Sequence, residues 1–284
     1  KRHNCYTYLG EIGVKSRMII KERLDVLLVQ QGYFPTRQRA QGAIMAGLVF
    51  VEGQRADKPG TKFPEDVTIR VQGQEHPYVS RGGLKLERAI KQLGFDPAGR
   101  VVIDVGASTG GFTDCALQHG AIRVYAVDVG YAQLAWTLRQ DERVVVMERT
   151  NARYLQASDF PERADAATID VSFISLGTIL PPVVELLTPD GEIVALIKPQ
   201  FEAGREKVGK RGVVREAATH RQVIRQVWDT AASLGLGLVG LTFSPITGPQ
   251  GNIEFLARFK SAADDVIEDQ IANVVELAHA SLKG

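Results

Sequence analysis

The chain has 284 residues, enough for one large domain or two smaller ones that each bury a core. Its hydrophobic fraction of 44% and charged fraction of 24% are those of an ordinary globular protein, and a net charge of +1 gives no overall attraction to nucleic acid. Cys5 and Cys115 form neither a disulfide framework nor a metal-ligand spacing, and no apolar run reaches the roughly 18 residues of a membrane span. We therefore expect a cytoplasmic protein without a bound metal and without a membrane partner.

Residues 1–17 differ from the sequence that follows them. They contain no apolar core of the kind that a signal peptide needs, and they show no clear periodicity. A regular pattern begins at Met18. We therefore expect 1–17 to be an upstream extension or a remnant of expression that lies outside the fold.

Residues 18–73 are predicted to form a small α+β domain. Three leucines at helical spacing, from Leu24 to Leu28, precede a second helix over 37–46, for which Thr36 is a suitable N-terminal cap. Short β-branched runs at 48–51 and 67–71 then predict strands.

This domain resembles the alpha-L RNA-binding motif of a small-subunit ribosomal protein, tyrosyl-tRNA synthetases and many pseudouridine synthases. The matching residues are Arg23-Leu24-Asp25, Gly32, Thr36-Arg37, Ala40, Ile44, Gly47, Val49, Val51, Gly53 and Lys58-Pro59. The stretch from Val26 to Val51 contains arginines but no acidic residue, so it can present a basic face to phosphates; the alternative is an ordinary solvated helix face. The resemblance implies RNA contacts by Arg23, Arg37, Arg39 and Lys58.

A larger α/β domain is predicted over 80–262, after a linker over 74–79 that Pro77 interrupts and before a C-terminal helix or tail over 263–284. Its first helix covers 82–93. Alternating β-branched and helical runs then indicate a mostly parallel seven-stranded sheet, whose ligands bind beyond the carboxyl ends of the strands. The predicted strands are Val101–Val105, Val124–Val129, Val144–Met147, Ala166–Asp170, Ile193–Ile197, Gly237–Phe243 and Ile253–Arg258. The predicted helices are Phe112–His119, Tyr131–Arg139, Ile174–Leu187 and Thr219–Leu234.

A glycine turn follows the first of these strands. Ser108 stands where a dinucleotide-binding fingerprint has its second glycine, so that fingerprint is not met. The turn instead resembles the first motif of Rossmann-like methyltransferases, acidic-x-G-x-x-x-G, which passes under the methionine moiety of S-adenosylmethionine. Asp128 ends the second strand, where an acidic side chain can bind the ribose hydroxyls; a purely structural turn is the alternative. The expected cofactor contacts are Asp104, Gly106, Ser108, Gly110, Gly111, Phe112, Asp128 and Asn151.

Four ionisable residues follow one another along the chain at the expected edge of the sheet. Taken singly, Asp170 can cap a helix, Lys198 can extend out to solvent, and Glu254 can be an exposed strand residue. In the order Lys85, Asp170, Lys198, Glu254, they resemble the Lys-Asp-Lys-Glu tetrad of FtsJ-like ribose 2′-O-methyltransferases. With the alpha-L motif in front, the chain from about Lys21 to Lys260 is similar to the TlyA (haemolysin A-like) family of rRNA methyltransferases. Its matching strings are YVSRGGLKL, DVGASTGGFTD, DVSFISL, KPQFEAGR and GNIEF.

A hydroxyl acceptor suits these side chains. Residues 170–173 read Asp-Val-Ser-Phe and lack the Asn/Asp-Pro-Pro-Tyr/Phe string of exocyclic-amine methyltransferases, and Cys115 lies on the wrong element for a carbon-5 nucleophile. A ribose hydroxyl is a weak acid, so we expect Lys198 to act as the base in its neutral form, which desolvation and a second cation favour. Asp170 would orient Lys198, and Glu254 would hold Lys85 or the ribose.

A second basic stretch indicates a polyanionic substrate, ribosomal RNA or a ribosomal subunit. Residues 198–225 contain eight Lys or Arg against three acids, and three glycines suggest a mobile loop beside the active site, although a merely solvated loop is the alternative. The expected RNA contacts here are Arg81, Arg205, Lys207 and Arg211. The competing hypotheses are a membrane-active haemolysin and an RNA-binding protein with an inactive methyltransferase fold. The sequence does not determine the oligomeric state.

Overall fold

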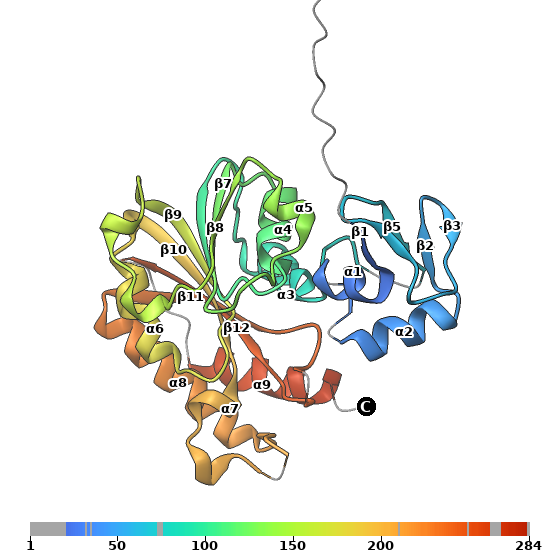
Figure 1. Ribbon diagram of the computed structural model, residues 1–284. Helices are drawn as coiled ribbons and strands as arrows, with labels where there is room; N and C mark the ends of the chain where they lie inside the picture. The colour runs from blue at the N-terminus through green and yellow to red at the C-terminus, as the bar shows by residue number, and fades with distance from the viewer. Residues whose placement is uncertain are drawn as a thin grey trace, which may run out of the picture.

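The computed structural model describes residues 21–31, 33–34, 36–72, 76–209, 211–248, 250–261 and 268–282. It has a small N-terminal domain and a larger α/β domain, and the small domain lies on the side of the first helix of the large one (Figure 1). The predicted extension over 1–17, Gly32 of the alpha-L match and part of the predicted linker and tail lie outside the described residues.

The N-terminal domain packs two helices against short strands. Thr36 caps the second helix as expected, because its hydroxyl accepts a hydrogen bond from the Arg39 amide at 3.3 Å. Apolar side chains from both helices and the central strand form a separate core. The elements are β1 (Lys21–Arg23), α1 (Leu24–Gln30), α2 (Arg37–Met45), β2 (Val49–Val51), β3 (Gln54–Arg55), β4 (Lys62–Pro64) and β5 (Ile69–Val71).

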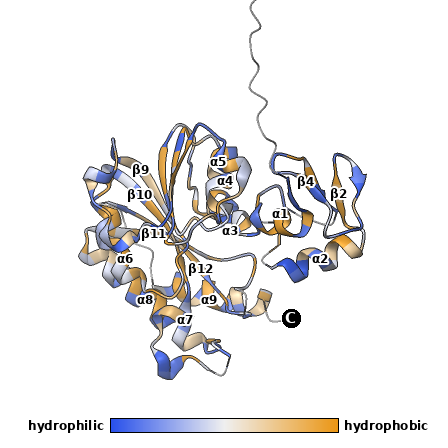
Figure 2. Cartoon of the chain, viewed as in Figure 1, coloured by the Kyte–Doolittle hydropathy of each residue, from blue (hydrophilic) through white to orange (hydrophobic). Residues whose placement is uncertain are grey.

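The large domain is built on the expected seven-stranded sheet. The strands are β6 (Val101–Val105), β7 (Arg123–Val127), β8 (Val144–Met147), β9 (Ala164–Ile169), β10 (Leu187–Ile197), β11 (Leu236–Phe243) and β12 (Phe255–Ser261). Their order is β11-β12-β10-β9-β6-β7-β8, and β12 alone runs against the others. Most side chains of the central strands β6 and β9 are apolar and buried, because helices cover both faces of the sheet (Figure 2).

Each face of the sheet has its own hydrophobic core. The helices are α3 (Gly82–Leu93), α4 (Gly111–Gln118), α5 (Trp136–Arg139), α6 (Leu176–Val184), α7 (Pro199–Glu202), α8 (Ala217–Ser233) and α9 (Glu268–Leu282). Side chains of α3, α4 and α5 pack on one face, and those of α6, α8 and α9 pack on the other (Figure 1). None of the helices among the described residues is long and apolar enough to cross a bilayer.

Several predicted elements need correction. The helix expected over Ile174–Leu187 ends at Val184, and the strand expected over Ile193–Ile197 already begins at Leu187. The helix expected over Tyr131–Arg139 forms only at its last turn, α5. The segment before α5 makes other hydrogen bonds in place of helical ones. The Gly130 amide donates to the Asp128 carboxylate at 2.7 Å, and the Gly130 carbonyl accepts from the Arg149 amide at 3.0 Å. The last strand begins at Phe255, so Glu254 lies just before it and not within it.

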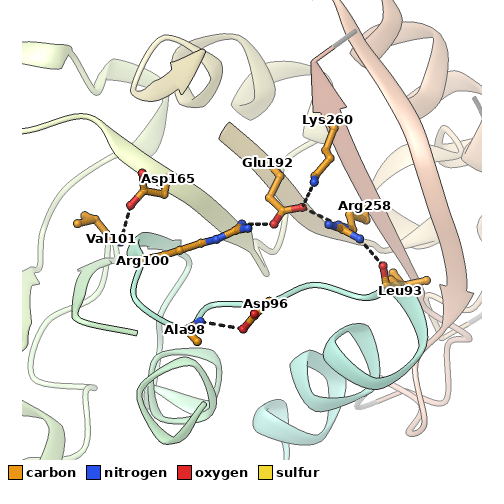
Figure 3. A network of polar contacts seen from close by, with 9 residues as sticks. All are labelled: Leu93, Asp96, Ala98, Arg100, Val101, Asp165, Glu192, Arg258 and Lys260. Carbon is orange, nitrogen blue, oxygen red and sulfur yellow. Dashed lines mark hydrogen bonds and ion pairs between the residues drawn. The ribbon is translucent and has the colours of Figure 1, made fainter. Parts of the chain in front are cut away.

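One buried carboxylate links several segments on the side of the sheet away from the tetrad. Glu192 on β10 has no exposed surface, and it contacts Arg100, Arg258 at 2.6 Å and Lys260 at 3.6 Å (Figure 3). Three cations offset the cost of burying this charge. The network therefore ties the middle of β10 to β12 and to the segment before β6, on the side away from the carboxyl ends of the parallel strands.

Candidate active site

The four predicted tetrad residues meet at one edge of the sheet. Asp170 follows β9, Lys198 follows β10, Glu254 precedes the antiparallel β12, and Lys85 comes from α3. The Lys198 ammonium lies 2.6 Å from one oxygen of Asp170, and the Lys85 ammonium lies 3.6 Å from the other. Lys85 also donates to Glu254 at 2.8 Å. The order in space is therefore Lys198, Asp170, Lys85, Glu254, with cations and carboxylates alternating.

This alternation favours the ionised forms of Asp170 and Lys85. Burial raises the pKa of Asp170, but the two neighbouring lysines outweigh burial and hold the pKa below its usual value. Burial lowers the pKa of Lys85, but Asp170 and Glu254 outweigh it and raise the pKa above its usual value. The alternative roles are not observed: Ser175, and not Asp170, caps α6, and Glu254 is 1% exposed.

Glycines allow three segments to approach one another at this edge. Gly106 has a φ of +86°, and a Cβ there would lie 2.6 Å from the Asp170 carbonyl oxygen. A Cβ on Gly111 would lie 2.8 Å from the Gly83 amide nitrogen. Side chains at these two positions would therefore push the glycine turn away from Asp170, and α4 away from the helix that carries Lys85.

The glycine turn and the tetrad line a single cavity of about 240 Å³. All four tetrad residues reach it, as do Ser80, Gly82, Gly106, Ala107, Ser108, Thr109, Gly111, Phe112 and Ser172. Of the predicted cofactor contacts, Gly106, Ser108, Gly111 and Phe112 line this cavity. Asp104, Gly110, Asp128 and Asn151 do not.

Asp128 and Asn151 lie beside the cavity, after the next two strands. The Asp128 carboxylate accepts hydrogen bonds from the amides of Ser108 at 2.8 Å and Gly130 at 2.7 Å, so it also holds the glycine turn in place. Asn151 accepts from the Arg153 amide at 3.2 Å. Its segment is joined to that of Asp128, because the Thr150 amide donates to the Asp128 carbonyl.

Asp104 has a different position from the one we expected. It is fully buried, and its oxygens accept hydrogen bonds from the hydroxyls of Thr113 at 2.6 Å and Thr168 at 2.9 Å. Asp104 therefore does not line the cavity, and a direct contact of its side chain with the cofactor stays a prediction. Its hydrogen bonds join the strand to α4 and β9, and burial raises its pKa to about 6.

We expect Asp104→Asn to flatten the pH dependence of stability. An acid whose pKa is about 6 when folded and 3.8 when unfolded loses stability as pH rises between those values. As pH rises across this interval, the free energy of unfolding of the wild type should therefore fall by up to ~3 kcal/mol, and the variant should not show this fall. Urea unfolding at pH 4 and pH 7 measures the difference, and parallel curves for the two proteins would contradict it.

The predicted RNA-contact residues of the N-terminal domain fall into two groups. Arg23 and Arg37 pair with the buried Asp25 at 3.0 and 2.9 Å, and these arginines hold the pKa of Asp25 well below its usual range. Both side chains remain about half exposed, at 42% and 55%. Arg39 and Lys58 are exposed. Asp25 therefore orients two of the cations without covering them.

The remaining predicted RNA contacts come from two segments of the large domain, and none of them lines the cavity. Arg81 is exposed at the start of α3, and Arg205, Lys207 and Arg211 are exposed on the segment after α7. Lys207 contacts Gln222 of α8. Lys210 of this basic stretch lies outside the described residues.

Ser172 and the neighbouring Phe173 are among the residues that were not singled out from the sequence. Ser172 lines the cavity and accepts a hydrogen bond from Lys198 at 2.9 Å. Phe173 beside it is 90% exposed, has a φ of +64°, and lies with its ring centroid 5.0 Å from that of Phe201. A bulky residue in the left-handed region is strained, and such strain concentrates at functional sites. A run reading Asp-Val-Ser-Phe carries no sequence signal for this conformation.

Comparisons with known proteins agree with this geometry. The FtsJ-like methyltransferase family matches residues 78–261, and the S4 domain family matches residues 22–69. The candidate rRNA methyltransferase YqxC of Bacillus subtilis is 54% identical over 269 residues, covering 93% of this chain and 96% of that protein. The 16S/23S rRNA (cytidine-2′-O)-methyltransferase TlyA of Mycobacterium tuberculosis is 43% identical over 248 residues, covering 87% and 92%.

A solved structure is similar to this chain over both the N-terminal domain and the large domain. The structure of a candidate haemolysin from Streptococcus thermophilus has a TM-score of 0.74 and 48% sequence identity, and it covers 93% of this chain and 98% of that one. Sequence and structural similarity thus extend across the N-terminal domain as well as the catalytic fold. The chain therefore belongs to the FtsJ-like methyltransferase family and, with an S4 domain in front of the catalytic fold, to its TlyA (haemolysin A-like) branch.

Proposed function

We propose that the protein transfers a methyl group from S-adenosylmethionine to a ribose 2′-hydroxyl of ribosomal RNA. The observation that carries this proposal is the alternating Lys198, Asp170, Lys85 and Glu254 array, which lines the same cavity as the glycine turn. The relatives named as rRNA methyltransferases support the substrate class. We propose the domain division 18–73, 74–79 and 80–262 for RNA docking, connection and catalysis.

The residues of the cavity fit S-adenosylmethionine. Gly106 and Gly111 present bare backbone to the cavity, and Phe112 offers an apolar wall. Asp128 stands at the end of the neighbouring strand and can accept hydrogen bonds from ribose hydroxyls. When bound, the sulfonium supplies an activated methyl group. Gly110 and Asn151 would shape this site without lining the cavity.

The two lysines of the tetrad have different roles in the reaction. Lys198 in its neutral form takes the proton of the 2′-hydroxyl, because its nitrogen lies in the cavity and is oriented by Asp170 and Ser172. Lys85 lies between Asp170 and Glu254 and supplies a positive charge that stabilises the developing alkoxide. In-line placement of the hydroxyl against the methyl group completes the site.

Methylation of purified ribosomal subunits with labelled S-adenosylmethionine tests the function. A 2′-O-methyl group protects the adjacent phosphodiester from alkaline cleavage, so the labelled nucleotide should remain in an alkali-resistant dinucleotide. Label on a base would overturn the proposed acceptor. Membrane lysis without RNA methylation would favour the haemolysin hypothesis, and S-adenosylmethionine binding without turnover would favour the inactive fold.

The cofactor site gives a second test. We expect Asp128→Ala to weaken S-adenosylmethionine binding by at least about tenfold, which is ~1.4 kcal/mol, because the variant loses the ribose acceptor and releases the Ser108 amide. Calorimetric titration measures this change. Asp159→Ala, on a remote exposed turn, is the matched control. Unchanged affinity in Asp128→Ala would place the ribose elsewhere.

RNA docking gives a third test. We expect replacement of both Arg37 and Arg39 by alanine to raise the apparent Michaelis constant for RNA and to flatten its salt dependence by about two phosphate contacts. S-adenosylmethionine affinity should stay the same, since both residues lie in the other domain. Methylation rates measured over a salt series provide the slope. If the slope does not move, α2 does not face RNA.

A further inference from the structure

One buried side chain connects the basic segment after α7 to the turn before Glu254. We define the basic loop as Arg205–Gly209 together with 211–215. Asn252 has no exposed surface. Its amide nitrogen donates to the Gly212 carbonyl at 2.8 Å, and its amide oxygen accepts from the Val214 amide at 3.0 Å.

The basic loop is a compact turn with its cations outside. The Gly212 amide donates to the Gly209 carbonyl, and the Gly209 amide donates to the Val213 carbonyl, both at 3.1 Å. Val213 and Val214 are buried at its base, whereas Arg205, Lys207 and Arg211 are exposed. The contacts of Asn252 therefore fix the base of the loop and leave its charged side chains free to reach a ligand.

The backbone of Asn252 contacts a turn that lies against the tetrad. Its carbonyl accepts from the Gly248 amide at 2.9 Å, which closes a turn with Gly251. A Cβ on Gly248 would lie 2.6 Å from a carboxylate oxygen of Glu254, so this turn lies directly against the catalytic carboxylate. Asn252 thus touches both the loop that carries the cations and the turn that places Glu254.

We propose that Asn252 is a positioning residue, which sets the basic loop at a fixed place relative to the tetrad so that phosphates near the target ribose bind there. This inference rests on the proposed RNA methylation. The side chain must be an amide, because the loop offers one carbonyl and one amide group to it. Aspartate would keep the acceptor but place an oxygen against the Gly212 carbonyl, and alanine would satisfy neither group.

A double-mutant cycle tests the connection. Asn252→Ala should raise the Michaelis constant for RNA and flatten its salt dependence by about two to three phosphate contacts, with unchanged S-adenosylmethionine affinity. Replacing Arg205, Lys207 and Arg211 by alanine should produce the same loss in the wild type but little further loss in Asn252→Ala. Fully additive losses would show that Asn252 does not act through the loop.

A second variant, placed in the basic loop itself, tests the same link if Asn252→Ala fails to fold. Gly212 has a φ of +74° and open space at its Cβ, so Gly212→Ala strains the loop without a clash and should also raise the Michaelis constant. Gly235→Ala is the matched control, since Gly235 has a φ of +79° and open space at the end of α8. Equal effects of the two glycine variants would overturn the inference.

The outcomes separate the inference from the function on which it rests. If the wild type methylates RNA and the triple loop variant does so equally well, the proposed function stands and the inference is overturned. Absence of RNA methylation by the wild type overturns both.

Discussion

Replacement of Lys198 by alanine is expected to leave a folded protein that binds S-adenosylmethionine but turns over about 10² to 10⁴ times more slowly, the usual contribution of a general base. Lys198 lies 2.6 Å from Asp170 and 2.9 Å from Ser172, and its nitrogen lines the cavity. Removing it leaves the hydroxyl proton without an acceptor. Single-turnover methylation of saturating RNA measures the chemical step directly.

Lys198→Arg distinguishes a base from a fixed positive charge. A guanidinium keeps its proton near neutral pH, so it can replace the charge beside Asp170 but not the proton acceptor. We therefore expect no rescue by arginine. If this variant retained about half the wild-type rate, Lys198 would be an electrostatic or positioning group, and solvent or another residue would take the proton.

The largest loss of stability is expected from Lys85→Met. The ammonium group of Lys85 lies between Asp170 and Glu254, and Glu254 is 1% exposed. Methionine keeps the length of the side chain but leaves a buried carboxylate without its partner, which costs about 3–5 kcal/mol. Urea unfolding measures this loss as a shift of the midpoint, and methylation should be lost as well.

The double variant Lys85→Met with Glu254→Gln is the control. It removes the unpaired charge, so most of the stability should return, whereas methylation should not. If the single variant were as stable as the wild type, the Lys85–Glu254 contact at 2.8 Å would have no energetic importance. If the double variant methylated RNA, the roles proposed for these residues in the reaction would be wrong.

A general rule predicted the meeting of two of the four tetrad residues. The carboxyl ends of parallel strands lie at one edge of a sheet, so Asp170 after β9 and Lys198 after β10 had to be close. The rule does not place Glu254, which comes before a strand. It reaches the same edge because β12 runs in the opposite direction, and strand direction depends on long-range pairing that local periodicity does not encode.

Other differences arise from side-chain partners that a pattern does not reveal. The sequence shows no acid between Val26 and Val51, but Asp25, one residue earlier, pairs with Arg37. Asp104 occupies a motif position, and only the structure shows that Thr113 and Thr168 enclose it. The short α5 and the left-handed Phe173 likewise depend on neighbouring segments and not on local propensity.

The place of β12 within the sheet has a consequence for the newly made chain. During synthesis, β10 and β11 are made before β12, which must then insert between them. Until residue 261 is available, both strands keep open edges that can pair with other chains. Glu254 arrives in this same late segment. A polypeptide interrupted anywhere before β12 therefore lacks both the complete seven-stranded sheet and the complete tetrad.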